Sequence, residues 1–270
     1  MAADELLDSL TLAQVSGHAQ CGQGAVAKLD GQLGLEVDAA VVNSGIGHAI
    51  VNKLREIYPE ATIHATYKHH RPDTGRDDGV IWHQLDITLE EEIKQLSQNI
   101  PQLDWLINCI GMLHTEDKGP EKSLQTLDGD FFLHNIQLNT LPSMMLAKHF
   151  EPALKRSASA RFAVISARVG SISDNRLGGW YSYRASKAAL NMFLKTLSIE
   201  WQRSIKHCVV LSLHPGTTDT PLSKPFQQSV PKEKLFTPEY VAQCLVGIIA
   251  NATPTQTGQF LAYDGVELPW

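Results

Sequence analysis

The feature that most constrains the fold of this chain is a regular alternation of short apolar runs with longer amphipathic stretches, which begins near residue 35. Runs with the character of β-strands are Val37–Val42, Ala61–Tyr67, Gly79–Gln84, Trp105–Ile110, Arg161–Ser166, His207–Leu213 and Phe260–Tyr263. Stretches with helical periodicity are Gly47–Ile57, Glu90–Gln98, Leu127–Leu154, Tyr183–Trp201 and Thr237–Ala250. This alternation predicts a single α/β domain, with a doubly wound parallel sheet and helices on both faces.

Two of the predicted helices have N-terminal signals. Thr88 and Glu91 have N-cap and capping-box spacing, in which side chains satisfy the free amides of the first turn. Thr237 precedes Pro238 and Glu239, and proline suits the first turn of a helix. We therefore expect helices to begin just after Thr88 and just after Thr237.

The composition supports a compact domain and excludes some partners. Of 270 residues, 43% are hydrophobic and 19% charged, which is enough apolar sequence for a sizeable core. The formal net charge of −6 argues against nucleic acid or an anionic membrane as the main partner. The longest apolar runs are also far too short to cross a bilayer.

The cysteines and the N-terminus favour a cytoplasmic location. No C-x-x-C pair or metal-ligand spacing occurs among the cysteines, which have the character of small buried residues in a reducing compartment: Cys21, Cys109, Cys208 and Cys244. The acidic start of the chain lacks the basic region of a secretion signal. Residues 1–34 show no sustained periodicity, so we expect a poorly ordered extension before a domain at residues 35–270.

Tyr183 and Lys187 are four residues apart at the start of a predicted helix, so their side chains share one helix face. A lysine ammonium there favours the phenolate and lowers the pKa of the tyrosine from about 10. Such a phenol can exchange a proton with a substrate oxygen near neutral pH. The spacing also arises by chance, and a surface tyrosine over a lysine stem is the alternative.

Other polar and glycine-rich segments lie where predicted strands end. They are Gly45-Ile46-Gly47, Asn108-Cys109-Ile110-Gly111 and the stretch from His214 to Thr220. Asn139 lies inside the long predicted helix. Ligands of a doubly wound sheet bind outside the carboxyl ends of its strands, so these segments are candidates for one shared site.

Together these residues resemble the short-chain dehydrogenase/reductases, from Gly45 to Trp270. The stretch from Ile165 to Tyr183 and the ending from Asp264 to Trp270 look like the C-factor and sniffer-type carbonyl reductases within that superfamily. The resemblance implies a Rossmann fold and an NAD(P)-dependent oxidoreductase that reduces an aldehyde or ketone, a small-molecule substrate. It also implies pairing into a homodimer or homotetramer.

The resemblance implies roles for individual residues. Tyr183 would be the general acid, Lys187 would lower its pKa and hold the nicotinamide ribose, and Asn139 would kink its helix and continue a proton relay. Expected cofactor contacts are Gly45, Ile46, Gly47, Asp86, Ile87, Asn108, Gly111, Lys187, Pro215, Gly216 and Thr220. Each role has a purely structural alternative. Asp86 could be a helix cap, Asn139 an ordinary helix residue and Pro215-Gly216 a plain turn.

The end of the second predicted strand bears on the choice between NADP and NAD. An NAD site carries an acidic residue there for the ribose 2′-hydroxyl. This chain has Lys68 and Arg71, a point charge and a planar fork that suit a 2′-phosphate, so NADP is the expected cofactor and NAD the less favoured one. A solvated basic loop is the alternative. His69 and His70 lack a third ligand in the sequence, so no metal site is expected.

The chain departs from the family at the catalytic serine. The position three residues before Gly170 is Ala167. Ser166 is adjacent, but neighbouring strand residues point to opposite faces, so it can serve only if the strand end bends. Ser171 is a second candidate. A lost hydroxyl donor costs about 10²–10³ in rate by analogy with an oxyanion-hole donor.

A second departure affects the glycine-rich turn. Counting back from Gly45 places Val41 where the family has its first glycine. If Ala39–Val42 is the strand instead, the turn is about two residues short. Either arrangement impairs the phosphate cradle, which needs close backbone approach.

These departures leave two functions open. The leading one is an NADP-dependent reductase of carbonyl compounds. The other is a catalytically weak or inactive nucleotide-binding or signalling protein on the same scaffold. Residues 217–236 have the composition of a mobile lid. Side chains that suggest a partly apolar pocket are Met112, Leu113, Trp180, Leu222 and Phe226.

Overall fold

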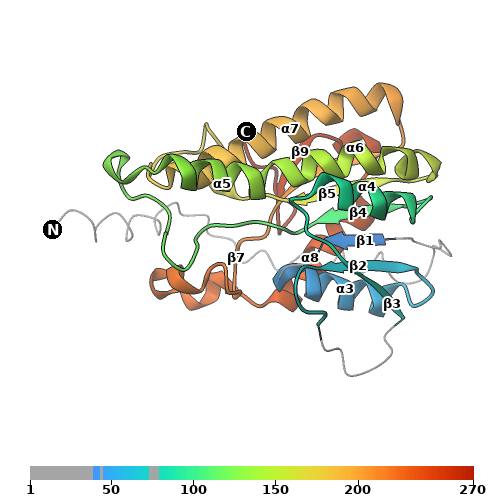
Figure 1. Ribbon diagram of the computed structural model, residues 1–270, viewed down its shortest axis with the longest axis horizontal. Helices are drawn as coiled ribbons and strands as arrows, with labels where there is room; N and C mark the ends of the chain where they lie inside the picture. The colour runs from blue at the N-terminus through green and yellow to red at the C-terminus, as the bar shows by residue number, and fades with distance from the viewer. Residues whose placement is uncertain (1–38, 43–44, 73–78) are drawn as a thin grey trace.

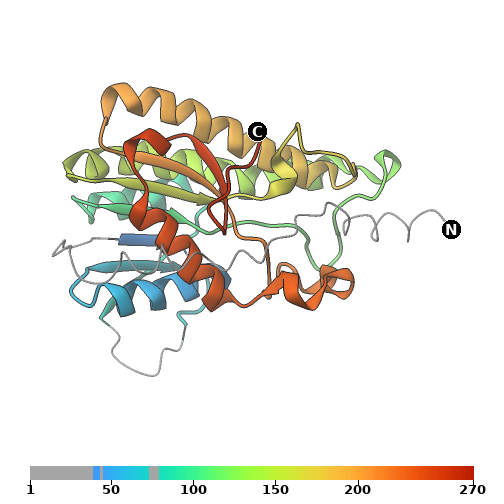
Figure 2. The same ribbon diagram turned by 180° about the vertical axis from the view of Figure 1, so that it is seen from behind.

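The computed structural model describes residues 39–42, 45–72 and 79–270. The extension expected at residues 1–34 lies outside the described residues. Within them, the chain forms a central sheet between two layers of helices, as Figure 1 and Figure 2 show from opposite sides.

In the described part of the chain, the central sheet has seven parallel strands in the order β3-β2-β1-β4-β5-β6-β9. The strands are β1 (Ala39–Val42), β2 (Ile63–Tyr67), β3 (Val80–Gln84), β4 (Trp105–Asn108), β5 (Arg161–Ile165), β6 (Val209–His214) and β9 (Gln259–Ala262). Every residue of β4 and β5 is buried, as expected for parallel strands covered on both faces. The doubly wound prediction is confirmed.

Helices cover both faces of this sheet (Figure 1). One face carries α3 (Gly45–Ile57) and α8 (Pro238–Asn251), and the other carries α4 (Glu90–Gln98), α5 (Gly129–Asn139), α6 (Leu141–Arg156) and α7 (Tyr181–Ser204). Each layer has its own cluster of buried apolar side chains against the sheet. On α3, Ile50 and Leu54 are four residues apart on the buried face, and each buried side chain contributes about 1.5–3 kcal/mol.

The strand order reverses between β1 and β4, which lie side by side at the centre of the sheet. Val42 of β1 is in register with Asn108 of β4, so the two strands end at the same level. The crevice outside such a switch point is where doubly wound sheets bind ligands. The fold therefore brings the carboxyl ends of the central strands to one edge of the sheet.

The single long helix expected at Leu127–Leu154 is wrong. The chain forms α5 and α6, which meet at Thr140, where φ is −119° and ψ is −56°. Pro142 explains the break, because proline lacks the amide hydrogen and clashes with the preceding turn inside a helix but fits the first turn of a new one. Asn139 is therefore the last residue of α5, directly before the break at Thr140.

The two expected helix starts have different outcomes. Thr237 is the N-cap of α8, and its hydroxyl accepts from the amide of Tyr240 at 3.2 Å, as predicted. The capping box at Thr88 is wrong, because α4 begins after Leu89 and no side chain caps it. The amide and hydroxyl of Thr88 instead donate to Oδ1 of Asp86, at 3.0 and 2.6 Å.

Of the two arrangements considered for the glycine-rich turn, the structure has the short one. β1 is Ala39–Val42 and α3 begins at Gly45, so only two residues separate strand and helix.

Farther along the chain, β7 (Thr217–Thr218) pairs in parallel with β8 (Leu235–Phe236) as a separate small sheet. The segment between them carries the short helices η4 (Lys224–Ser229) and η5 (Lys232–Lys234), at the position expected for a lid.

Candidate active site

Tyr183 and Lys187 lie in the first turns of α7 and share one face of it. The Lys187 Nζ atom is 5.9 Å from the centroid of the Tyr183 ring. Both side chains are buried, with exposed fractions of 6% and 2%. Lys187 Nζ donates to the carbonyl of Ile165 at the end of β5, at 3.0 Å, and no carboxylate pairs with it within the described residues.

Burial controls the protonation of this pair. Loss of water raises the pKa of the Tyr183 phenol and lowers the pKa of the Lys187 ammonium to about 8. The expectation that Lys187 holds the pKa of Tyr183 below its usual value is therefore wrong for the protein alone. A phenol with a raised pKa keeps its proton at neutral pH, which is the state that a general acid needs.

Asn139 joins α5 to both the end of β4 and α7. Its Oδ1 accepts from the amide of Met112 at 2.6 Å, and its Nδ2 donates to the Met112 carbonyl at 2.8 Å and to Ser186 Oγ at 2.9 Å. Ser186 is one residue before Lys187. Asn139 thus fixes the segment after β4 relative to the helix that carries the tyrosine and lysine.

Gly111 lies against the same pair. A Cβ at this position would be 3.3 Å from Lys187 Nζ, a tight contact, and 3.5 Å from Asn139 Oδ1, an ordinary one, so a side chain there would crowd the lysine ammonium. Asn108, the last residue of β4, donates from Nδ2 to Ser143 Oγ at 2.8 Å and accepts from the amide of Ile110 at 3.0 Å. Asn108 shapes the strand end, and Gly111 keeps space open beside Lys187.

The glycine-rich turn at the start of α3 lies against Thr220, one of the residues expected to contact the carboxamide. Gly45, Ile46 and Gly47 form its first turn, which contains no acidic residue. A Cβ on Gly45 would lie 3.0 Å from Cγ2 of Thr220, so the segment after β6 reaches the helix start. A helix N-terminus without acidic side chains favours an anion.

Pro215 and Gly216 follow β6 and lead into the lid segment. Gly216 has a φ of 73°, and a Cβ there would lie 2.8 Å from the Phe236 ring. Both the left-handed backbone and the ring contact therefore require glycine at this turn.

Lys68 and Asp86 follow β2 and β3, and they form an ion pair of 2.9 Å. Asp86 also accepts from Thr88. These contacts lower the pKa of Asp86 to about 2, and the hydrogen bond from the Thr88 hydroxyl contributes most, followed by that from Lys68. Ile87 packs in the core under α4 and α6. Arg71 is exposed and forms no ion pair within the described residues.

The hydroxyls near Ala167 differ in their partners. Ser166 is buried and donates to Asn191 Oδ1 at 2.7 Å, an oxygen that also accepts from Ser212. The Ser166 hydroxyl is therefore engaged in the core beneath α7, and its catalytic role stays a prediction. Ser171 Oγ accepts from the amide of Asp174 at 3.1 Å and donates to no acceptor within the described residues. Ser171 is the hydroxyl that keeps a proton to give.

A series of ring contacts leads outward from Tyr183. The Trp180 ring lies 6.3 Å from it, Phe226 of η4 lies 5.4 Å from Trp180, and His114 lies 5.9 Å from Phe226, all between centroids. His114 Nε2 is buried without a hydrogen-bond partner in the described structure. His114 was not among the residues expected at the site, because it follows β4 in a loop without periodicity. Its position three residues after Gly111 in the sequence was the available signal.

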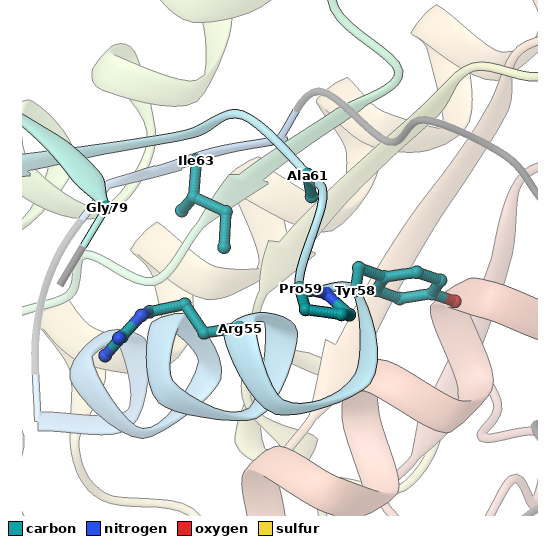
Figure 3. Close-up of a pocket in the computed structure, with 6 residues that line it drawn as sticks. All are labelled: Arg55, Tyr58, Pro59, Ala61, Ile63 and Gly79. Carbon is teal, nitrogen blue, oxygen red and sulfur yellow. The ribbon is translucent and has the colours of Figure 1, made fainter.

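A separate pocket lies at the opposite edge of the sheet (Figure 3). It is lined by the end of α3, the turn after it and the residues that begin β2 and precede β3: Arg55, Tyr58, Pro59, Ala61, Ile63 and Gly79. These residues lie at the amino ends of the strands, and no expected site residue is among them. The candidate site is therefore distinct from this pocket.

The described residues lack two further kinds of feature. They contain no group of three or more His, Cys, Asp and Glu side chains placed to hold a metal ion. None of their helices combines the length and apolarity that crossing a membrane requires.

Comparison with known proteins places the chain in a family. The model of the short chain dehydrogenase family matches residues 33–231. A 1-hydroxy-2-glutathionyl-2-methyl-3-butene dehydrogenase from Rhodococcus sp. (strain AD45) is 34% identical over 190 residues, covering 69% of this chain and 78% of the relative. C-signal from Myxococcus xanthus is 30% identical over 168 residues, covering 62% of this chain and 93% of the relative.

Solved structures agree on the fold. The carbonyl reductase Sniffer of D. melanogaster and an NADPH-bound carbonyl reductase from chicken fatty liver each superpose with a TM-score of 0.76 at 23% identity. Each match covers 87% of this chain, with 100% and 95% of the other chain. The resemblance to the C-factor and sniffer-type proteins is confirmed, and the chain belongs to the short-chain dehydrogenase/reductase family of oxidoreductases.

Proposed function

We propose that this protein is an NADPH-dependent reductase of small-molecule aldehydes or ketones, with Tyr183 as the general acid. The observation that carries the proposal is the buried pair of Tyr183 and Lys187 on one face of α7, tied by Asn139 to the end of β4. Membership of an oxidoreductase family supports it. The two superposed carbonyl reductases, one of them NADPH-bound, support the reaction and the cofactor.

The residues present fit a nicotinamide dinucleotide. Lys187 is buried without a carboxylate partner in the described structure, beside the space that Gly111 leaves open. The first turn of α3 offers amides without an acidic side chain for a pyrophosphate. Lys68 and Arg71 offer positive charge at the end of β2 for a 2′-phosphate.

Bound NADPH would supply a hydride to the carbonyl carbon. Tyr183, protonated at neutral pH, donates its hydroxyl proton to the carbonyl oxygen. The phenolate left behind lies near the Lys187 ammonium, and attraction between opposite charges in a water-poor site stabilises it. Asn139 holds the Lys187 turn through Ser186, and Ser171 is the hydroxyl available as a second donor to the carbonyl oxygen.

Turnover tests the proposal directly. NADPH consumption is measured with a panel of aldehydes, ketones and diketones, with product formation as the second readout. Reduction of at least one class with NADPH supports the function. No product from any class, with NADPH binding intact, contradicts it.

Two observations favour a second candidate, a catalytically weak or inactive nucleotide-binding or signalling protein. Ala167 replaces the serine that the family expects, and only two residues separate β1 from α3 where the phosphate cradle forms. The discriminating result is quenching of protein fluorescence by NADPH without turnover of any carbonyl. Binding together with turnover rejects this candidate.

We also propose a homodimer or homotetramer formed through α5 and α7. Leu133 on α5, and Met192 and Ile199 on α7, are large apolar side chains with exposed fractions of 58%, 66% and 47%. Light scattering measures the assembled mass, and a monomer contradicts the proposal.

We further propose a cytoplasmic location, which cell fractionation tests. We also propose that residues 35–270 fold as an independent domain, which a chain shortened to these residues tests.

A further inference from the structure

A buried carboxylate lies beside the start of α7. Glu121, in the loop between β4 and α5, is only 4% exposed. Its Oε2 accepts from the amide of Ser182 at 3.0 Å, its Oε1 accepts from the Ser182 hydroxyl, and its backbone carbonyl accepts from the amide of Trp180 at 2.5 Å. Every hydrogen bond that Glu121 forms in the described structure goes to this helix start.

The cost of burying a charge makes this arrangement informative. A carboxylate removed from water needs hydrogen-bond donors or a cation. No Lys, Arg or His forms an ion pair with Glu121 within the described residues. The amide and hydroxyl at a helix N-terminus are favourable donors for a negative charge. The donors at the helix start therefore offset the cost of burying the Glu121 carboxylate. In return Glu121 caps α7, because the side chain of the N-cap residue Trp180 forms no capping hydrogen bond.

The segment that Glu121 contacts has an unusual backbone. Gly178, Gly179 and Trp180 have φ values of 66°, 64° and 53°, and Trp180 is the one residue other than glycine with a positive φ in the described structure. A left-handed tryptophan is strained and persists only where its surroundings hold it. Arg184 Nε donates to the carbonyls of Gly178 and Gly179 at 3.2 and 3.0 Å. Glu121 holds the third residue of this turn and Arg184 holds the first two.

This turn leads directly into the proposed proton donor. Tyr183 follows Ser182, and its ring contacts the Trp180 ring edge-on at 6.3 Å. The two residues that Glu121 holds are thus the covalent neighbour and the ring neighbour of Tyr183. A displacement of about 1 Å in a reacting group can cost 10²-fold in rate.

We propose that Glu121 is a positioning residue, which holds Trp180 and the first turn of α7 and so fixes the Tyr183 hydroxyl at the substrate. The proposal rests on the proposed function, because it assigns Tyr183 as the acid. Glu121 itself touches neither substrate nor cofactor in this account. Its effect should therefore appear in the rate of reduction and not in the affinity for NADPH.

Two variants test the contact. In Glu121→Gln the side chain keeps one acceptor, while its amide group faces a donor of Ser182. Ser182→Ala removes only the hydroxyl hydrogen bond to Glu121. It is the milder variant, and it still tests the contact if Glu121→Gln fails to fold. The control is Glu116→Gln, an exposed acid in the same loop. The readouts are kcat, KM, NADPH affinity and hydrogen exchange of residues 178–187.

We expect kcat to fall about 10–100-fold in Glu121→Gln and less in Ser182→Ala, with NADPH affinity within about twofold of the unmodified protein. Exchange at the start of α7 should accelerate in both variants, and Glu116→Gln should change neither readout. Combining the two changes should add little to Glu121→Gln alone, because both remove one contact. A lower melting temperature with unchanged kcat would show a purely structural cap and overturn the proposal.

The exchange readout separates this proposal from the proposed function. If the unmodified protein reduces no carbonyl, the function fails, while faster exchange in Glu121→Gln still supports the hold on α7. Unchanged exchange at residues 178–187 overturns the proposal whatever the activity.

Discussion

Asn139→Ala should lower the stability of the fold by an amount that follows from its hydrogen bonds. The amide oxygen and nitrogen of Asn139 satisfy the backbone amide and carbonyl of Met112, and the nitrogen also donates to Ser186 Oγ. Both Asn139 and Met112 are buried, so water cannot replace the lost partners without rearrangement. The substitution therefore leaves two backbone groups unsatisfied at the centre of the molecule.

The magnitude follows from the cost of such groups. Each unsatisfied buried polar group costs about 1–3 kcal/mol, so we expect a loss of roughly 2–6 kcal/mol for the pair. Because 1 kcal/mol shifts the melting temperature of a domain this size by about 2–4 °C, the melting temperature should fall by roughly 4–24 °C. Asn139→Asp keeps the oxygen that accepts from the Met112 amide but loses the Nδ2 group that donates to the Met112 carbonyl and to Ser186. The new carboxylate oxygen then faces the Met112 carbonyl, and neither can donate a hydrogen bond.

Thermal unfolding followed by circular dichroism measures the effect. The matched control is Asn52→Ala, an exposed asparagine on α3 for which we expect a change of less than about 0.5 kcal/mol. A melting temperature for Asn139→Ala equal to that of the control would refute the reasoning, because it would show that the contacts across β4, α5 and α7 contribute nothing.

Three further predictions concern the proposed reaction. Because burial lowers the pKa of Lys187 to about 8, the ammonium loses its proton above that pH, and kcat/KM should fall as pH rises through about 8; a flat profile to pH 10 would contradict its role. NADPH should bind more tightly than NADH by roughly 1–3 kcal/mol, and replacing Lys68 and Arg71 by glutamate should remove the difference; equal affinities in the unmodified protein would be inconsistent with this. Ser171→Ala should lower kcat about 10²-fold, and Ser166→Ala should act mainly on stability; the reverse pattern would restore Ser166 as the donor.

The fold was predictable because its signals are local and repeated. A continuous apolar run identified the buried strand β4, and amphipathic periodicity identified α3 and α7. The errors occurred where a single residue competes with a periodic pattern. Pro142 ends the periodicity that made Leu127–Leu154 resemble one helix, and Asp86 takes the Thr88 hydroxyl that capping-box spacing had assigned to α4.

The site was predictable in its members but less so in their chemistry. Tyr183, Lys187, Asn139 and Gly111 come together as the strand order requires. The sequence could not show that burial raises the pKa of Tyr183. It also could not show that Glu121 reaches α7 from a loop about sixty residues earlier, because contacts between loops leave no periodic pattern.

The most direct test of the central claim is the effect of Tyr183→Phe on carbonyl reduction and on NADPH binding, measured in the same preparation. The account predicts that kcat falls about 10²–10⁴-fold, because the proton donor is lost, while NADPH affinity stays within about twofold, because Lys187 and the helix start of α3 remain. Reduction at a substantial fraction of the unmodified rate would contradict the assignment of Tyr183 as the general acid.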